Sequence, residues 1–420
     1  MMTSLQFVSL LGVIAMPALA WAFSRDRRAV NWRTVFWATG LQLAFALLVI
    51  KTPPGQQFFA YMNDAVSKLL SFQEEGGRFV FGNLALSPGK EGSMGFFFAF
   101  QVLTTIIFMS SLMSVLYYLG IMQKVVMFFA WIMEKTCLVS GAEALCAAAN
   151  IFVGHTEAPI LIRPYLEEMT ESELLCVIVA GFSTIAAGVL TAYVGILRPY
   201  FPDVAGHLIA KSVMSAPAAL LMTKLLIPET GKPKTMGKLS IAYEDKSVNV
   251  IESAANGAST GLQMALNVGT MLVAFMAIIA MLNFGVRWAT GFTGYPMGME
   301  NILGYIFAPV SWLMGVPWKD CAVVGQFIGE KTLLNEFVAY VHMGQFLATN
   351  PGVLDPRSIV IGSYAVCGFG SFMSIAIIIG GVGALAPSRR QDLARLGLLA
   401  LVGSSLATFM TAAIAGLLIG

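Results

Sequence analysis

The chain has 420 residues, of which 57% are hydrophobic and only 11% are charged, and its formal net charge is +2. A soluble domain carries about a quarter charged residues and slightly under half apolar ones. The composition therefore excludes a soluble enzyme, a disordered protein and a nucleic-acid-binding protein. Long uncharged runs are each able to cross a hydrocarbon core about 30 Å thick as a helix, which needs ~20 residues. These runs are 92–123, 174–197, 253–286, 358–388 and 396–420.

The first membrane helix is predicted at the N-terminus. Residues 17–22 resemble a signal-peptide cleavage site, but no Lys or Arg precedes Arg25, so the positive region of a signal peptide is missing. We interpret this segment as a helix that is retained. Arginines follow it, and positive loops stay in the cytoplasm, so the N-terminus is expected outside. The arginines are Arg25, Arg27, Arg28 and Arg33.

The next predicted helices alternate in direction. Residues 34–50 return outward, and residues 92–120 cross inward. Between them, residues 57–72 place apolar side chains such as Phe58 and Leu69 on one face and Asp64 on another. This spacing is typical of a helix that lies in the membrane interface.

The remaining topology depends on two unusual segments, 141–166 and 317–344. If each enters and leaves the membrane on one side, then the helices 174–197, 204–227, 261–286, 358–385 and 396–420 alternate correctly. All the large basic loops then lie in the cytoplasm, including Lys232, Lys234, Lys238 and Lys246, and Arg389, Arg390 and Arg395. The prediction is an all-α polytopic membrane protein with about eight transmembrane helices, two re-entrant hairpins and interfacial amphipathic helices.

The first unusual segment contains polar side chains in a stretch broken by Gly154 and Pro159. A carboxylate at the centre of a membrane helix costs about 2.5–3.5 kcal/mol on insertion scales, so such residues are rare and usually functional. Broken helices at membrane depth are tolerated where they line a cavity or contact protein. The polar residues here are Asn150, His155, Thr156 and Glu157.

The second unusual segment, 317–344, contains Glu330, Lys331 and Glu336 within the stretch 325–337. Each unusual segment precedes an uncharged helix with small polar residues inside it, 181–188 after the first and 368–374 after the second. The same order thus occurs twice, entering from opposite sides. This is the mark of inverted repeats around a binding site at the membrane midplane.

Structural alternatives exist for these residues. Glu157 or Glu336 could pair with Arg163 or Lys331, and His155 could be a packing residue. The five cysteines have neither a CxxC motif nor zinc-like spacing, so we interpret them as small packing residues.

Several short motifs carry a resemblance to a known family over essentially the whole chain. The chain resembles the concentrative nucleoside transporters of the bacterial, sodium-coupled type. The motifs are Ala-Asn-Ile-Phe-Val-Gly at 149–154, Thr-Glu-Ala-Pro at 156–159, Phe-Ala-Pro at 307–309, Gly-Val-Pro-Trp at 315–318, Asn-Glu-Phe-Val-Ala-Tyr at 335–340, Cys-Gly-Phe at 367–369 and Ala-Ala-Ile-Ala-Gly at 412–416.

The resemblance implies a homotrimer in the plasma membrane, or the inner membrane of a Gram-negative cell, that takes up nucleosides with sodium. It places Thr156, Glu157 and Val189 at the base, and Glu336, Phe369 and Ser374 at the ribose. It implies a sodium site made by the side chains of Asn150 and Thr184 and the carbonyls of Val153 and Ile185. It implies no organic cofactor, no nucleic-acid partner and no enzymatic activity.

Two residues depart from the pattern of similar members at predicted substrate contacts. His155 replaces a glutamine and Ser371 replaces an asparagine. A neutral imidazole offers one donor and one acceptor and can also take a proton near neutral pH. Sodium coupling is the preferred interpretation, and a proton-coupled transporter of nucleosides or related compounds that uses His155 is the alternative.

Two other classes were weighed against a transporter. His155 and Glu157 could suggest metal chemistry, but no His-Glu-x-x-His motif is present. Polar midplane residues also line channels, although hairpins from opposite sides favour alternating access.

We expect four regions: scaffold helices and an interfacial helix at 1–138, the first hairpin and transport helices at 139–228, a cytoplasmic linker, an interfacial helix and a scaffold helix at 229–316, and the second hairpin and transport helices at 317–420. Both termini are expected outside.

Overall fold

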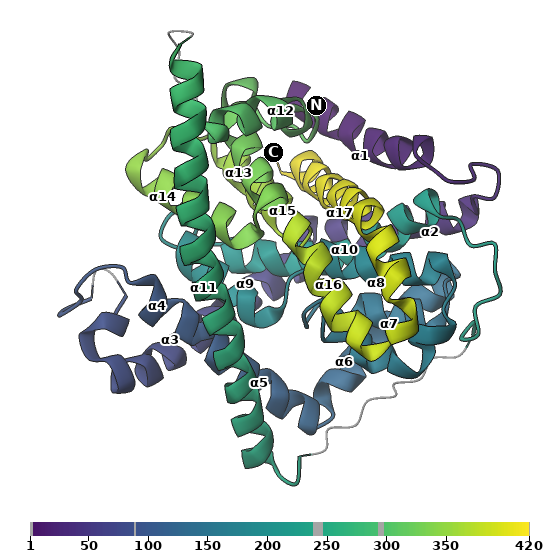
Figure 1. Cartoon of the computed structure of the whole chain (residues 1–420), viewed down its shortest axis with the longest axis horizontal. Coiled ribbons are helices and arrows are strands. Elements are labelled where there is room, and N and C mark those ends of the chain that lie inside the picture. The colour runs from purple at the N-terminus through teal and green to yellow at the C-terminus, as the bar shows by residue number, and fades with distance from the viewer. Residues whose placement is uncertain (1–2, 88–89, 238–246, 293–297, 420) are drawn as a thin grey trace.

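The computed structural model describes residues 3–87, 90–237, 247–292 and 298–419, and this part of the chain contains helices and no strand. Figure 1 shows a bundle of short and broken helices with one long helix, α11, along its side. The α-helices are α1 Ser4–Ala22, α2 Trp32–Lys51, α3 Pro53–Phe81, α4 Phe98–Gln101, α5 Leu103–Tyr118, α6 Ile121–Cys137, α7 Gly141–Ala149, α8 Glu171–Ser183, α9 Ala187–Leu197, α10 Val204–Leu226, α11 Val250–Gly291, α12 Met299–Leu313, α13 Cys321–Leu333, α14 Glu336–Thr349, α15 Pro356–Val366, α16 Phe372–Leu385 and α17 Arg390–Leu418.

Seven helical segments of the described chain are long and apolar enough to cross a membrane. They are Ser4–Ala22, Trp32–Lys51, Phe98–Tyr118, Glu171–Leu197, Val204–Leu226, Val250–Gly291 and Pro387–Leu418. These correspond to seven of the eight predicted spans. The remaining one, 358–385, is divided into α15 and the shorter apolar helix α16. The protein is thus a multi-pass helical membrane protein, as predicted.

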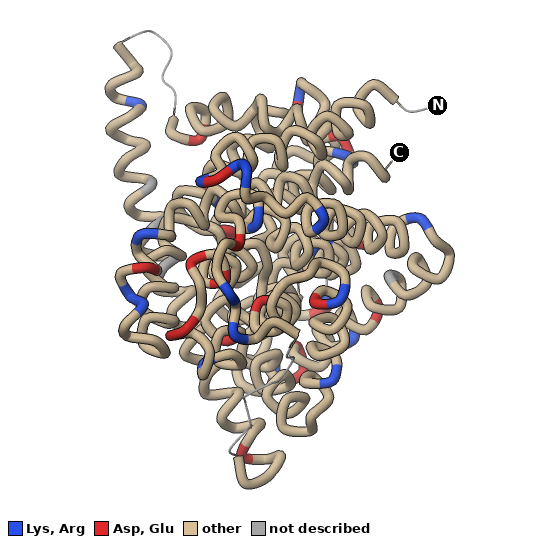
Figure 2. The backbone as a smooth tube through the Cα atoms, turned by 90° about the vertical axis from the view of Figure 1, so that its right-hand side faces the viewer, with Lys and Arg blue, Asp and Glu red and all other residues tan. Residues whose placement is uncertain are grey.

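Figure 2 shows that charged residues are few and lie in separate groups along the chain.

Two expected elements differ in their bounds. The predicted span 261–286 belongs to the much longer α11, which at 1.5 Å per residue extends about 63 Å. The predicted span 92–120 starts as helix only at Phe98, because Gly92 and Gly95 adopt positive φ angles before it. Lys238 and Lys246, predicted in the cytoplasm, lie outside the described residues.

Basic loops from distant parts of the chain meet at one end of the molecule, which we call the basic end. Arg25 and Arg395 both form ion pairs with Glu171. Lys234 pairs with Glu168 at 2.6 Å. Three loops predicted to share the cytoplasmic side therefore do share one side.

The two chain termini meet at the opposite end. Gln6 Nε2 donates to the Leu417 carbonyl at 3.3 Å, and Arg357 Nη1 donates to the Ile419 carbonyl at 2.5 Å. Figure 1 also places N and C near each other. Helices α1 and α17 thus both run from the basic end to this terminal end.

The two hairpins enter from opposite ends. Hairpin 1 consists of α7, a turn at 150–157 and a 3₁₀-helix at Ala158–Glu168. Its base is at the basic end, because the Gly141 amide donates to the Thr235 carbonyl at 3.0 Å. Hairpin 2 consists of α13 and α14, with its tip at 334–335. Its base is at the terminal end, where the Asp355 amide donates to Asp320 at 3.0 Å. This is the predicted inverted arrangement.

Local sequence signals explain where the hairpin elements begin. Ser140 and Glu143 form a capping box that starts α7, and Thr170 and Glu173 form another that starts α8. The Ser140 hydroxyl also donates to Glu173 at 2.6 Å, which joins the two caps. The base of hairpin 1 is thereby fixed to the helix that follows it.

Two helices lie outside the set of candidate membrane spans. α3 contains the predicted interfacial segment, and neither α3 nor α12 belongs to the candidate spans. Among the described helices, α7, α8, α10 and α15 have the largest share of buried residues. All five cysteines are buried and form no disulfide, so the packing interpretation is confirmed.

Candidate functional site

The turn of hairpin 1 presents its polar residues in a compact loop. The Glu157 carboxylate accepts a hydrogen bond of 3.1 Å from the Gly154 amide, and the Glu157 amide donates to the Gly154 carbonyl at 3.0 Å. Pro159 follows two residues later, where a 3₁₀-helix replaces the α-helix. This arrangement leaves the second Glu157 oxygen available to a ligand.

Two long helices are interrupted opposite the hairpins. The first break, residues 184–186, separates α8 from α9, and the second break, residues 367–371, separates α15 from α16. The breaks cross each other, because the Phe369 amide donates to the Thr184 carbonyl at 3.2 Å and the Gly370 amide donates to Phe182 at 2.9 Å. Gly368, with φ +155°, approaches the Phe182 carbonyl too closely for a side chain. The predicted helix interruptions are therefore adjacent in space.

The predicted sodium ligands lie where α7 ends and the first break begins. Asn150 Nδ2 donates to the Cys146 carbonyl at 2.9 Å, while its buried Oδ1 has no hydrogen-bond partner among the described residues. The Thr184 hydroxyl donates to the Ala180 carbonyl at 2.9 Å, so the lone pairs of its oxygen remain available to a cation. The Phe152 carbonyl accepts from the Ala187 amide at 2.9 Å, so the turn and the break touch.

Val153 and Ile185 are the two predicted carbonyl donors, and both are buried. Val153 belongs to the turn of hairpin 1, and Ile185 lies at the centre of the first break. The four residues thus occupy two neighbouring non-helical segments, which is the backbone state that leaves carbonyls free for a cation.

His155 lies between aromatic rings in the part of the site that connects the two breaks. Its ring centroid is 4.8 Å from that of Phe369 and 6.1 Å from that of Phe182. His155 is 8% exposed, and neither ring nitrogen has a hydrogen-bond partner in the described structure. A buried imidazole with two unsatisfied nitrogens is costly unless a ligand or water uses them.

Glu336 starts α14 at the tip of hairpin 2 and is buried. Its carboxylate accepts a hydrogen bond of 2.9 Å from the Tyr193 hydroxyl of α9. The Tyr193 ring stacks on Tyr340 with 4.1 Å between centroids and packs edge-on against Phe337 at 5.0 Å. Hairpin 2 is therefore joined to the helix that follows the first break.

The other predicted substrate residues have varied surroundings. Thr156 packs closely against Gly381 of α16, and Val189 is buried on α9. Ser371 caps α16 and lies 2.9 Å from Ser374 Oγ. The Ser374 hydroxyl donates to the Phe369 carbonyl, so both serines hold the second break in shape. A substrate would have to share these hydroxyls with the backbone.

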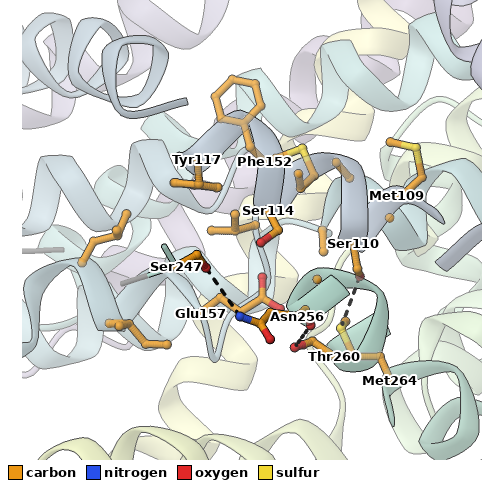
Figure 3. Close-up of a pocket in the computed structure, with 18 of the residues that line it drawn as sticks. Met109, Ser110, Ser114, Tyr117, Phe152, Glu157, Ser247, Asn256, Thr260 and Met264 are labelled. Atoms are coloured by element: carbon orange, nitrogen blue, oxygen red, sulfur yellow. Dashed lines mark hydrogen bonds between the residues drawn. The ribbon is translucent and has the colours of Figure 1, made fainter. Parts of the chain in front are cut away.

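A cavity of about 1170 Å³ adjoins the turn of hairpin 1. Figure 3 shows Glu157 and Asn256 projecting into it, with Ser110 and Ser114 on its α5 side. Asn256 of α11 donates through Nδ2 to the hydroxyl of Ser247, which precedes that helix, at 3.5 Å. The cavity has a mixed polar and apolar lining and the size of a small-molecule binding site.

The Glu157 and Glu336 carboxylates do not form the ion pairs that the sequence suggested as a structural alternative. In the described part of the chain, Glu157 and Glu336 make no ion pair with Arg163 or Lys331. His342 lies on α14, and its Nδ1 is 3.0 Å from the Glu330 carboxylate.

Sequence reasoning missed the buried side chains of Tyr193 and Lys211 near the breaks, and it gave Lys331 only a structural role as a possible partner of Glu336. Lys211 is a single charge inside the apolar run 204–223, which is a readable signal. Tyr193 lacked any such signal, because one tyrosine in an apolar helix is ordinary at the sequence level.

Family models match three parts of the chain. Residues 11–84 match the model described as "Na+ dependent nucleoside transporter N-terminus", and residues 207–416 match the corresponding C-terminus model. Residues 99–200 match a model described as "Nucleoside recognition". Together the first two models cover more than half of the chain.

Relatives from bacteria and animals align along nearly all of the chain. The nucleoside permease NupC of Helicobacter pylori is 41% identical, and the alignment covers 99% of this chain and 99% of that protein. An uncharacterized transporter of Haemophilus influenzae is 43% identical over 98% of this chain and 97% of its own. Human solute carrier family 28 member 3 is 41% identical over 98% of this chain, which spans only 60% of that protein's length.

Solved structures of CNTnw resemble the whole fold. CNTnw in an inward-facing substrate-bound state is 41% identical, with a TM-score of 0.91 and coverage of 99% of this chain and 98% of that one. A CNTnw variant in an outward-facing state gives a TM-score of 0.92, with 41% identity and coverage of 99% and 97%. The fold is thus similar to CNTnw both in an inward-facing and in an outward-facing state.

Proposed function

Since the chain belongs to the family of Na⁺-dependent nucleoside transporters, we propose that it imports nucleosides by coupling their uptake to an inward sodium gradient. The observation that carries this proposal is the pair of hairpins, which enter from opposite ends and meet two crossing helix breaks. Sites of this construction serve secondary transporters that alternate between two open states.

Asn150 carries the argument for sodium. Its buried Oδ1 lacks a partner among the described residues, and an amide oxygen is a suitable ligand for a small hard cation. Thr184 contributes a hydroxyl oxygen, and Val153 and Ile185 contribute carbonyls from the two neighbouring non-helical segments. The donor set is all oxygen, so it fits sodium. A bound sodium ion would supply positive charge that links hairpin 1 to the first break.

The nucleoside would bind between the two hairpins. We assign the base to His155, Thr156, Glu157 and Val189, and the ribose to Glu336, Phe369, Ser371 and Ser374. A buried carboxylate is a strong acceptor for the vicinal hydroxyls of ribose. The Tyr193 hydroxyl, which donates to Glu336, orients that carboxylate. The exposed face of Phe369 supplies an apolar surface for the sugar or base.

In this proposal, two of the regions predicted from the sequence move during transport and the other two form a static scaffold. Residues 139–228 and 317–420 carry both hairpins and both breaks and form the transport region, while residues 1–138 and 229–316 form the scaffold. The cavity of about 1170 Å³ lies between hairpin 1 and the α5 and α11 helices of the scaffold. It adjoins the start of α11, which follows the lysine-rich segment 232–246, so we assign it to the cytoplasmic release path.

We further propose a homotrimer in the plasma membrane, or inner membrane, with both termini outside. The basic end would face the cytoplasm, since three of its loops carry arginine or lysine. Exposed apolar side chains along α11, such as Leu266, Val273 and Phe284, supply a surface for lipid or for neighbouring subunits. Chemical cross-linking in membranes, followed by mass measurement, tests the trimer.

One observation favours a second coupling mode. Both ring nitrogens of His155 lack partners in the described structure, so this imidazole could carry a proton with the substrate. Uptake of tritiated nucleosides into proteoliposomes under separate sodium and proton gradients distinguishes the two modes. Accumulation driven by sodium alone supports the first, and accumulation driven by protons alone supports the second.

A further inference from the structure

Two buried lysines lie at the crossing of the two helix breaks, and the transport mechanism above gives neither a role. Lys211 belongs to α10 and Lys331 to α13, and both side chains are fully buried. Lysine is rarely buried without a partner, and in a membrane protein such a group marks a functional position.

Lys211 behaves as a cation at the end of a half-helix. Its ammonium donates to the carbonyl of Ser183, the last residue of α8. A methyl group built on Gly368 in the second break would lie 3.4 Å from Lys211 Nζ. The ammonium therefore binds the end of one broken helix and lies near the backbone of the other.

Lys331 occupies the other side of the same crossing. A methyl group built on Gly370 would lie 3.4 Å from Lys331 Nζ, 3.4 Å from the Phe182 carbonyl and 2.7 Å from Ser404 Oγ. Lys331 Nζ itself makes no hydrogen bond within the described ranges. An ammonium without a hydrogen-bond partner in the described structure thus shares a small space with two oxygen atoms.

This location is one where transporters bind cations. Half-helix C-terminal ends and unwound carbonyls coordinate the coupling ions of broken-helix transporters. The candidate sodium site uses the turn of hairpin 1 and Thr184, on the first break. The lysines hold positive charge at the crossing itself, beside the carbonyls of Phe182 and Ser183.

We propose that Lys211 and Lys331 are tethered cations that occupy the place of a second coupling ion at the crossing of the two breaks. Their positive charges belong to the protein, so they return with it in every cycle. Only the ion at Asn150 and Thr184 then moves with the substrate. This inference rests on the proposed sodium-coupled function and deepens it, because it predicts one sodium ion per nucleoside.

Lys331 is the better residue to change, since removing Lys211 would leave the Ser183 carbonyl unpaired. Lys331→Ala removes the charge and leaves room beside the oxygens of Phe182 and Ser404. Lys331→Met removes the charge but fills the space, and Lys331→Arg keeps the charge. Reversal potentials in proteoliposomes give the charge moved per nucleoside, and sodium titration of uptake gives the number of sodium ions.

The expected result is one sodium ion and one charge per nucleoside for the native protein and for Lys331→Arg, and two of each for Lys331→Ala. Lys331→Met should transport more slowly without gaining a second ion. Two sodium ions in the native protein or in Lys331→Arg would overturn the proposal, as would unchanged coupling in Lys331→Ala.

A binding measurement keeps the inference testable without transport. The melting temperature of each purified variant is measured in detergent against sodium chloride, with choline chloride as the control. Lys331→Ala should gain more stability from sodium than the native protein or Lys331→Met does. An equal gain in all three contradicts the tethered-cation role. If the native protein binds sodium but transports no nucleoside, the proposed function fails while this test of the lysines still stands.

Discussion

The Tyr193 hydroxyl donates a hydrogen bond of 2.9 Å to the Glu336 carboxylate, and it joins the helix after the first break to the tip of hairpin 2. The two residues are 143 positions apart in the chain and belong to different repeats. In the proposed mechanism this bond orients the acceptor of the ribose hydroxyls. It is therefore a contact through which the two repeats build one substrate site.

Tyr193→Phe should lower kcat/KM for nucleoside uptake about 10- to 100-fold. A hydrogen bond to a charged group contributes about 1.5–3 kcal/mol, and the phenylalanine ring preserves the stacking on Tyr340. Initial uptake rates in proteoliposomes over a range of substrate concentrations measure the effect.

Tyr340→Phe is the matched control for that change. Its hydroxyl donates to the Ser363 carbonyl at 2.8 Å and does not contact Glu336. It should affect stability more than substrate dependence. Equal losses of kcat/KM in the two variants would show that the Tyr193 hydroxyl has no specific role at the substrate.

Asn150→Ala should raise the sodium concentration for half-maximal uptake by about tenfold or more, since an oxygen ligand of the proposed site is lost. Asn150→Asp keeps an oxygen at that position and should retain sodium dependence better. Sodium titrations at constant ionic strength, with choline as the replacement, provide the measurement. An unchanged sodium requirement in Asn150→Ala would remove this residue from the ion site.

His155→Gln should change the order in which purine and pyrimidine nucleosides are preferred. The amide adds flexibility and a different pattern of donors and acceptors beside Phe369. Competition between labelled and unlabelled nucleosides, repeated at several pH values, checks the prediction. Sodium dependence should persist in the variant. Unchanged selectivity at every pH would return His155 to a packing role.

Lys224→Met should destabilise the protein by about 3–5 kcal/mol, because it leaves the buried Glu143 charge without its partner. Glu171→Gln breaks exposed ion pairs with Arg25 and Arg395, and such pairs contribute about 1 kcal/mol or less. Melting temperatures in detergent compare the two variants. A larger loss of stability in Glu171→Gln than in Lys224→Met would contradict the stabilising role of the buried Lys224–Glu143 pair.

The sequence predicted the architecture well because membrane insertion leaves strong signals. Uncharged runs mark the helices, and the positions of Arg25, Lys234 and Arg395 predicted that three distant loops share one end, which their ion pairs with Glu168 and Glu171 bear out. The two hairpins were recognisable because Gly, Pro and charged residues interrupt apolar runs at those places.

The candidate site was less accessible to sequence reasoning. Motifs identified hairpin residues such as Asn150 and Glu336, but hydrogen bonds between the two breaks depend on how distant helices pack. The Tyr193 contact with Glu336 is of this kind, since nothing local distinguishes that tyrosine. Lys211 was detectable as an isolated charge, yet its position against Ser183 required the three-dimensional fold.

The most direct test of the central claim is the accumulation of tritiated uridine or adenosine in proteoliposomes that contain the purified protein. We predict accumulation above the external concentration under an inward sodium gradient, and its loss in Asn150→Ala and Glu336→Ala. Accumulation that follows a proton gradient and ignores sodium would contradict the coupling. Failure of either gradient to drive any nucleoside would contradict the proposed function itself.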